Sequence, residues 1–146
     1  MQDNISAPDG LTEFLQDANA LLNRLNECHS HLEMIGNDPD AARGLCNALQ
    51  TLAARARGLG IAELADFSLQ IHHLLDSAQA RSRLHDTPLK TLSACLTHLA
   101  WQLELIDPRT GRLDLDCEEQ TVLVEALAGT LEAETPTPTM QNGGRR

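Results

Sequence analysis

Hydrophobic residues recur every three or four positions along most of this chain, a spacing that predicts amphipathic α-helices. The first such segment covers residues 11–35 and places a row of leucines on one side. Gly36-Asn37-Asp38-Pro39 predicts its end, because glycine and asparagine accept a left-handed cap and proline cannot continue a helix. Asp38 then suits the N-cap of a second helix over residues 39–57.

Three further segments show the same periodicity. Gly58-Leu59-Gly60 interrupts the second helix, and Thr87-Pro88 is typical of a helix start with proline in the first position. Asp116 is expected to cap the last helix, whose first turn gains from two glutamates near its positive end. The remaining expected helices are residues 61–82, 88–106 and 117–133.

Short loops between such helices predict an all-α fold: an antiparallel up-down four-helix bundle with a fifth, C-terminal helix on its side or end. A length of 146 residues fits one domain. We expect a flexible lead-in over residues 1–10, the bundle over 11–134, and a disordered tail over 135–146. The tail reads Thr-Pro-Thr-Pro-Thr and Gly-Gly-Arg-Arg, so it has almost nothing to bury.

Composition narrows the class of function. Hydrophobic residues make up 42% of the chain but aromatic residues only 2%, so leucine and alanine must form the core. A net charge of −10 repels phosphate backbones, which argues against nucleic-acid binding. The sequence shows no apolar run long enough for membrane insertion and no secretory signal at its start, which favours a cytoplasmic location.

Few residues are arranged for metal or cofactor chemistry. The four cysteines form no Cys-x-x-Cys pair and are interpreted as small buried hydrophobes in a reducing cytosol, with a zinc site or disulfide framework as the alternative. His29 and Glu33 lie one turn apart, which is weak support for a metal site. Phosphate loops and hydrolase motifs are missing, so we expect no cofactor. Trp101 is expected to anchor the core or one end of the bundle.

One motif points to a family. Leu52 is followed by Leu59-Gly60 and by Glu63-Leu64-Ala65, and Leu74-Leu75-Asp76 and Ala78 come further on. This order resembles the histidine phosphotransfer (HPt) domain of CheA-like chemotaxis kinases, in which an exposed histidine of the second helix accepts a phosphoryl group. The resemblance implies bacterial two-component or chemosensory signalling, with a response-regulator receiver domain or a histidine kinase as the partner.

The residues at the family's acceptor site have changed. Gln50 stands at the position of the phosphoacceptor histidine, and Ala53 and Ala54 replace the family's lysine and glycine. His72 stands where the family places a glutamate on the third helix. An amide is a poor nucleophile because its nitrogen lone pair is delocalised, and alanine cannot stabilise phosphoryl charge. We therefore interpret the site as degenerate, without a catalytic residue, and expect no enzyme activity.

His72 leaves three interpretations open: a surface histidine without a role, a hydrogen-bond partner of Gln50, or a relocated phosphoacceptor. The neighbouring His73 is a second candidate for a relocated acceptor. Arginines on or near the second helix form either a solvated face or a docking patch for an acidic partner. These arginines are Arg43, Arg55 and Arg57.

The favoured hypothesis is a pseudo-HPt interaction module that binds a receiver or kinase domain without passing phosphate. Its expected contact surface comprises Gln50, Ala53, Ala54, Arg55, Arg57 and His72. The alternatives are an active phosphotransfer protein with His72 or His73 as acceptor, and a helical bundle with a purely structural or oligomerisation role. The sequence leaves the oligomeric state open.

Overall fold

The structure is a computed structural model, and it describes residues 10–36, 38–77, 80, 83–114 and 117–133. The described part of the chain is all-helical, with five helices and no strand. They are α1 (Leu11–Ile35), α2 (Pro39–Gly58), α3 (Ala62–Leu75), α5 (Asp86–Leu105) and α6 (Glu118–Ala133). The lead-in and tail expected from the sequence fall almost entirely on residues outside these ranges.

The first two helices match their predicted bounds. Asp38 caps α2 as expected: its Oδ1 accepts hydrogen bonds from the backbone N–H groups of Asp40 at 3.0 Å and Ala41 at 3.5 Å. Pro39 takes the first helical position, where its missing N–H removes no helical hydrogen bond. Gly36 ends α1 with a φ of 68°, a conformation that glycine adopts without strain.

Helix α3 is shorter than the sequence predicted, because it ends at Leu75 rather than near residue 82. Ser77 Oγ accepts a hydrogen bond from the backbone N–H of Ala80 at 2.9 Å. A serine side chain that captures a backbone N–H three residues on competes with helix continuation. Helix α5 begins at Asp86, two residues before Pro88. Ala78 of the family motif and the predicted cap Asp116 lie outside the described residues.

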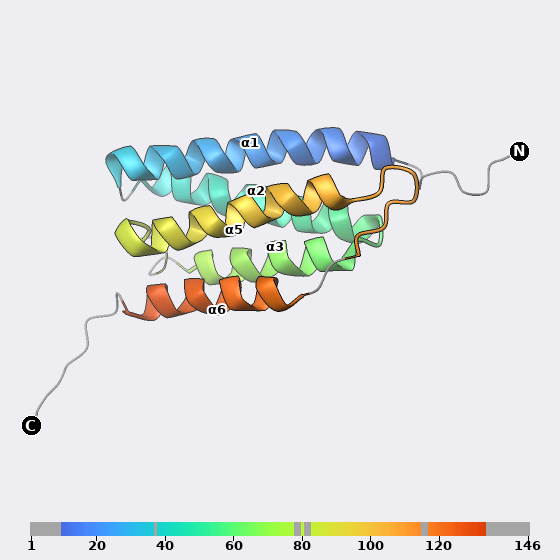
Figure 1. Cartoon of the computed structure of the whole chain (residues 1–146). Coiled ribbons are helices and arrows are strands. Elements are labelled where there is room, and N and C mark those ends of the chain that lie inside the picture. Colours follow the sequence, from blue (N-terminus) through green and yellow to red (C-terminus); the bar gives the residue numbers. More distant parts are fainter. Residues whose placement is uncertain (1–9, 37, 78–79, 81–82, 115–116, 134–146) are drawn as a thin grey trace, which may run out of the picture.

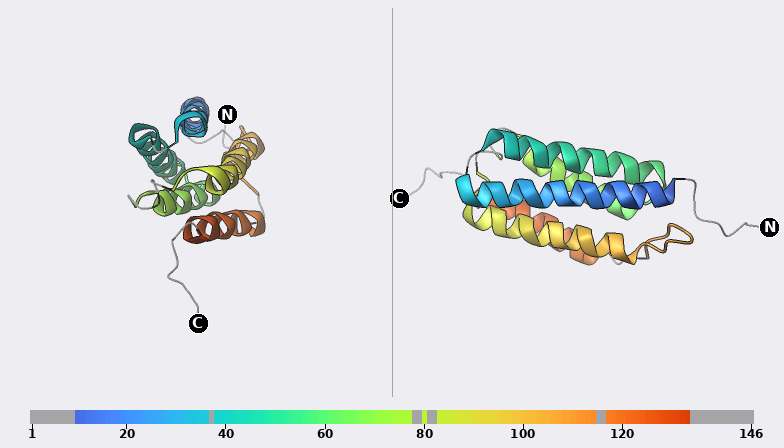
Figure 2. Two further views of the ribbon diagram at one scale, coloured as in Figure 1. Left: turned by 90° about the vertical axis from the view of Figure 1, so that its left-hand side faces the viewer. Right: turned by 90° about the horizontal axis from the view of Figure 1, so that it is seen from above.

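The helices lie side by side with roughly aligned axes (Figures 1 and 2). Helix α2 packs against α1 and α3, and α5 packs against α1 and α6. Helix α6 also touches α3, so it lies over the side where α3 and α5 approach each other. None of the helices, as far as the chain is described, has the length and apolar character needed to cross a membrane.

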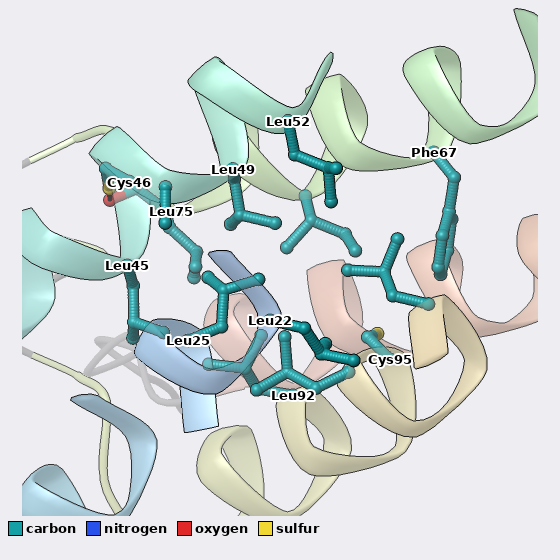
Figure 3. Close-up of a cluster of buried hydrophobic side chains, with 14 of the residues drawn as sticks. Leu22, Leu25, Leu45, Cys46, Leu49, Leu52, Phe67, Leu75, Leu92 and Cys95 are labelled. Atoms are coloured by element: carbon teal, nitrogen blue, oxygen red, sulfur yellow. Dashed lines mark hydrogen bonds between the residues drawn. The ribbon is translucent and has the colours of Figure 1, made fainter. Parts of the chain in front are cut away.

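Leucines from several helices fill the core, as Figure 3 shows. Leu25, Leu45, Leu49 and Leu92 are fully buried, so the prediction of a leucine-rich core without many aromatic residues is confirmed. The core also contains the aromatic ring of Phe67, which is fully buried. This ring packs edge-on against the ring of His98 at a centroid distance of 5.3 Å.

Two expectations about burial were wrong in part. Cys46 and Cys95 are buried, but Cys28 is half-buried and Cys117 is exposed, and none of these four described cysteines forms a disulfide. Cys117 directly precedes α6, its carbonyl accepts a hydrogen bond from the backbone N–H of Thr121, and the residue is exposed at this helix start. Trp101 is 46% exposed and is no core residue, because it lies on the outer side of α5.

Candidate docking site on helix α2

Helix α2 separates an apolar inner side from a polar outer row. Leu45, Leu49 and Leu52 are fully buried against the neighbouring helices. On the outer side, Gln50 and Ala54 are both exposed and lie one helical turn apart. Gln50, which the resemblance predicts to occupy the phosphoacceptor position, therefore lies at the surface and presents a primary amide.

Ala53 does not belong to this outer row. It is only 3% exposed, whereas Ala54 is exposed. The prediction that both alanines lie in the contact surface is corrected for Ala53, because the helix turns its Cβ inward, next to Leu52. A lysine at this position would have to extend its charged ammonium group from a buried site between packed side chains, which is energetically costly.

His72 reaches α2 from α3, but it does so below the surface. It is 8% exposed, and its Nδ1 lies 3.0 Å from the backbone oxygen of Cys46, one turn before Gln50. A carbonyl oxygen only accepts hydrogen bonds, so Nδ1 donates and the lone pair belongs to Nε2. The interpretation of His72 as a surface histidine is wrong, since the ring bonds the main chain of α2.

A second contact connects the same two helices. Cys46 Sγ donates to the backbone oxygen of Leu75 at 3.4 Å. Cys46 therefore accepts a hydrogen bond from α3 with its carbonyl and donates one with its thiol. These two bonds fix how far α3 is shifted along α2. His73 follows on the exposed side of α3, with its ring centroid 5.5 Å from that of His72.

The arginines of α2 are paired with aspartates. Arg55 bonds Asp17 of α1 at 2.5 Å, and Arg57 bonds Asp66 of α3 at 2.9 Å. Arg43 pairs with Asp40 within α2 at 3.1 Å. All three pairs are solvent-exposed, so each contributes little stability. They neutralise the local positive charge, so the surface is a row of ion pairs rather than a bare basic patch.

Two other histidines, His29 and His31, serve local structure. His29 Nε2 lies 2.7 Å from the backbone oxygen of Leu89, which ties α1 to α5. His31 Nδ1 lies 2.7 Å from the carboxylate of Asp38, the residue that caps α2. In the described ranges, groups of three or more His, Cys, Asp or Glu side chains that could hold a metal ion do not occur.

Sequence reasoning missed the residues that complete this site. Asp17 and Asp66 lie 38 and 9 positions from their arginines, so no helical spacing could pair them. The acceptor for His72 is a backbone carbonyl, which carries no sequence signal at all. Searches of family models, curated proteins and solved structures give no significant match to this chain. The case for a function therefore rests on the residues and their geometry.

Proposed function

We propose that this chain is a non-catalytic HPt-like module that binds a receiver domain or a histidine kinase in a bacterial two-component or chemosensory pathway. The proposal includes a cytoplasmic location and an antiparallel up-down bundle of α1, α2, α3 and α5 with α6 as the fifth helix. The direction of the chain alternates between successive helices in Figure 1, which supports this arrangement.

The hydrogen bond between His72 and the backbone of Cys46 carries the proposal. The α3 position that holds a carboxylate in the family does reach α2, within one turn of Gln50. This agrees with the register in which Gln50 replaces the acceptor histidine. A carboxylate at position 72 would face a carbonyl oxygen, so the histidine is the better partner for this buried seam.

The same geometry argues against phosphate transfer at this position. The exposed Gln50 amide is not a nucleophile, and the His72 side chain is only 8% exposed, so its ring is poorly placed for in-line attack on a phosphorylated receiver. What remains is an exposed outer row of α2 with Gln50 and Ala54, flanked by the pairs of Arg55 and Arg57. Polar, mixed-charge surfaces of this kind suit transient protein partners.

His73 supports a second candidate function, because its imidazole is exposed next to His72. An exposed, neutral imidazole could accept a phosphoryl group from a receiver aspartyl phosphate, with release of the free receiver carboxylate. This would make the chain an active phosphotransfer protein with an acceptor moved from α2 to α3.

Phosphotransfer assays separate these functions. Wild-type protein and Gln50→His are incubated with the receiver and kinase domains of the source cell, each labelled beforehand with radioactive phosphate. We expect acid-labile phosphate on Gln50→His and none on the wild type. Thr51→His is the matched control, because Thr51 is also exposed but points to another side of α2. Ala53→Lys is not combined with Gln50→His, because Ala53 is buried.

Wild-type labelling that disappears in His73→Gln would replace the docking proposal with the phosphotransfer alternative. Equal labelling of Gln50→His and Thr51→His would show that the added imidazole reacts without a docking geometry. If no receiver or kinase binds the wild type or labels either variant, the result favours the structural or oligomerisation role of the bundle over both signalling functions.

A further inference from the structure

A second surface lies away from α2, where α5 and α6 run side by side. A groove of about 470 Å³ opens between them. Its lining residues are Ala94, Thr97, His98 and Trp101 of α5 with Glu119 and Leu123 of α6. Because these are consecutive helical turns of two neighbouring helices, the groove follows the helix axes.

The two helices of the groove carry large exposed apolar side chains: Trp101 lines the groove, Leu105 lies one turn after Trp101, and Val122 adjoins the lining residue Leu123. Trp101 is 46% exposed, Leu105 of the same helix is 43% exposed, and Val122 of α6 is 62% exposed. Tryptophan is one of the residues enriched among those that contribute most binding energy at protein interfaces. Exposed apolar side chains gathered on two neighbouring helices mark an interaction surface more strongly than scattered exposed leucines do.

The two helices that form the groove are acidic, and Glu119 lies in its lining. Helices α5 and α6 carry six carboxylates against a single lysine, Lys90. Glu118 and Glu119 lie at the start of α6, and Glu104 follows Trp101 by one turn on α5. The carboxylates of the two helices are Asp86, Glu104, Glu118, Glu119, Glu125 and Glu132. A partner must therefore bring positive charge to these helices and apolar side chains to the groove.

His98 supplies an independent sign that the groove is incomplete. The side chain is 5% exposed, and its Nε2 has no hydrogen-bond partner in the described structure. Its ring lies between the ring of Phe67 and that of Trp101, which stands 5.4 Å away by centroid distance. Contact at Trp101 would thus be transmitted directly to a buried, unpaired polar group.

We propose that the groove between α5 and α6 binds an amphipathic helix of another protein that carries lysine or arginine along its edges. A helix laid in a groove buries its apolar side against Trp101 and Leu123 while its cations face the carboxylates. Cations near Trp101 also gain from its π-face. A second copy of this chain is a poor occupant, because its net charge of −10 would meet the same acidic helices.

Trp101 reports on its own groove, because it is the only tryptophan in the chain. The probe is a helical peptide of about 18 residues, roughly 27 Å long, with leucine at every third and fourth position, lysine elsewhere and no aromatic residue. The reference peptide has glutamate in place of lysine. We expect the leucine–lysine peptide to shift Trp101 emission to the blue, and the reference peptide to leave it unchanged.

Variants locate the binding. Glu119→Lys should weaken the leucine–lysine peptide about tenfold at low salt, whereas Glu27→Lys on α1 should change its affinity less than about twofold. Val122→Ser should weaken binding about fivefold, with Met34→Ser as the matched control, since Met34 is 82% exposed on α1. Circular dichroism checks that the variants keep their helices.

Three results would overturn the proposal. The first is an equal blue shift with the leucine–glutamate peptide, which would mean unselective apolar adsorption. The second is a peptide affinity that is unchanged by Glu119→Lys, or peptide binding that leaves Trp101 emission unchanged. The third is a blue shift that grows with protein concentration alone, together with a dimer in sedimentation, which would assign the groove to a second copy. This inference does not rest on the proposed function of α2.

Discussion

Gly44 allows α1 and α2 to approach closely, and replacing it tests that contact. A Cβ added at Gly44 would lie 2.7 Å from Cys28 Sγ, about 0.7 Å short of ordinary van der Waals contact at 3.4 Å. The next nearest atom is Nη2 of Arg24 at 3.7 Å, which is an ordinary contact. Gly44→Ala therefore strains one neighbour, and removing the Cys28 sulfur should remove the strain.

The size of the effect follows from two opposing terms. Alanine in a helix interior is favoured over glycine by about 1 kcal/mol. Overpacking by one methyl group costs about 1–3 kcal/mol, and Cys28 is only half-buried, so its sulfur has some room to move. We expect Gly44→Ala to lower the free energy of unfolding by about 1 kcal/mol in the wild type. In a Cys28→Ala background the same change should raise it by about 1 kcal/mol.

The measurement is urea unfolding of the wild type, both single variants and the double variant, followed by circular dichroism with a reducing agent present. The expected coupling energy between the two sites is about 2 kcal/mol. A coupling energy below about 0.5 kcal/mol would refute the reasoning, because the effects of mutations at independent sites add to within about that amount. Gly58→Ala is a control, since a Cβ there meets nothing within 4 Å.

Three further predictions concern titratable side chains. His72→Ala should lower the free energy of unfolding in urea by about 2 kcal/mol, because a buried ring and its bond to Cys46 are lost, whereas His73→Ala should change it by less than about 0.5 kcal/mol. Burial lowers the pKa of His98, although the Glu119 carboxylate opposes this effect. The unfolded chain then takes up that proton first, so stability should fall as pH drops through about 6.5, and His98→Leu should flatten this dependence in urea midpoints. Burial raises the pKa of Cys95 to about 12 while Cys117 is exposed, so a thiol reagent should react fastest with native Cys117, and Cys117→Ser should remove the fast phase.

Helix existence and most helix bounds could be predicted because the signals are local. The 3.6-residue period fixed the apolar sides, and Asp38 with Pro39 fixed the start of α2. The end of α3 was missed although Ser77 was visible, because the apolar period continues past the point where a serine side chain captures a backbone N–H. Whether a serine side chain or the next helical carbonyl binds a backbone N–H depends on local geometry, and the spacing of apolar residues carries no information about it.

The site was predicted less well because it depends on how helices rotate against each other. Gln50 was expected in the contact surface and is exposed. His72 follows the buried Leu64 and Ser68 at four-residue spacing, so its burial was readable from α3, but its polar side chain suggested the surface. The pairs of Arg55 and Arg57 with Asp17 and Asp66 join different helices, and such contacts appear only once the helices are assembled.

The two proposed surfaces can be tested against each other because they lie on different sides of the molecule. Helix α2 is flanked by α1 and α3, whereas the groove lies between α5 and α6 (Figure 2). Charge also separates them: the arginines of α2 are already matched by aspartates, while α5 and α6 keep an excess of carboxylates. A receiver bound at Gln50 should therefore leave the Trp101 response to the leucine–lysine peptide unchanged. If receiver and peptide instead compete, the two surfaces share one partner footprint or are coupled through α3, the helix that contacts both α2 and α6.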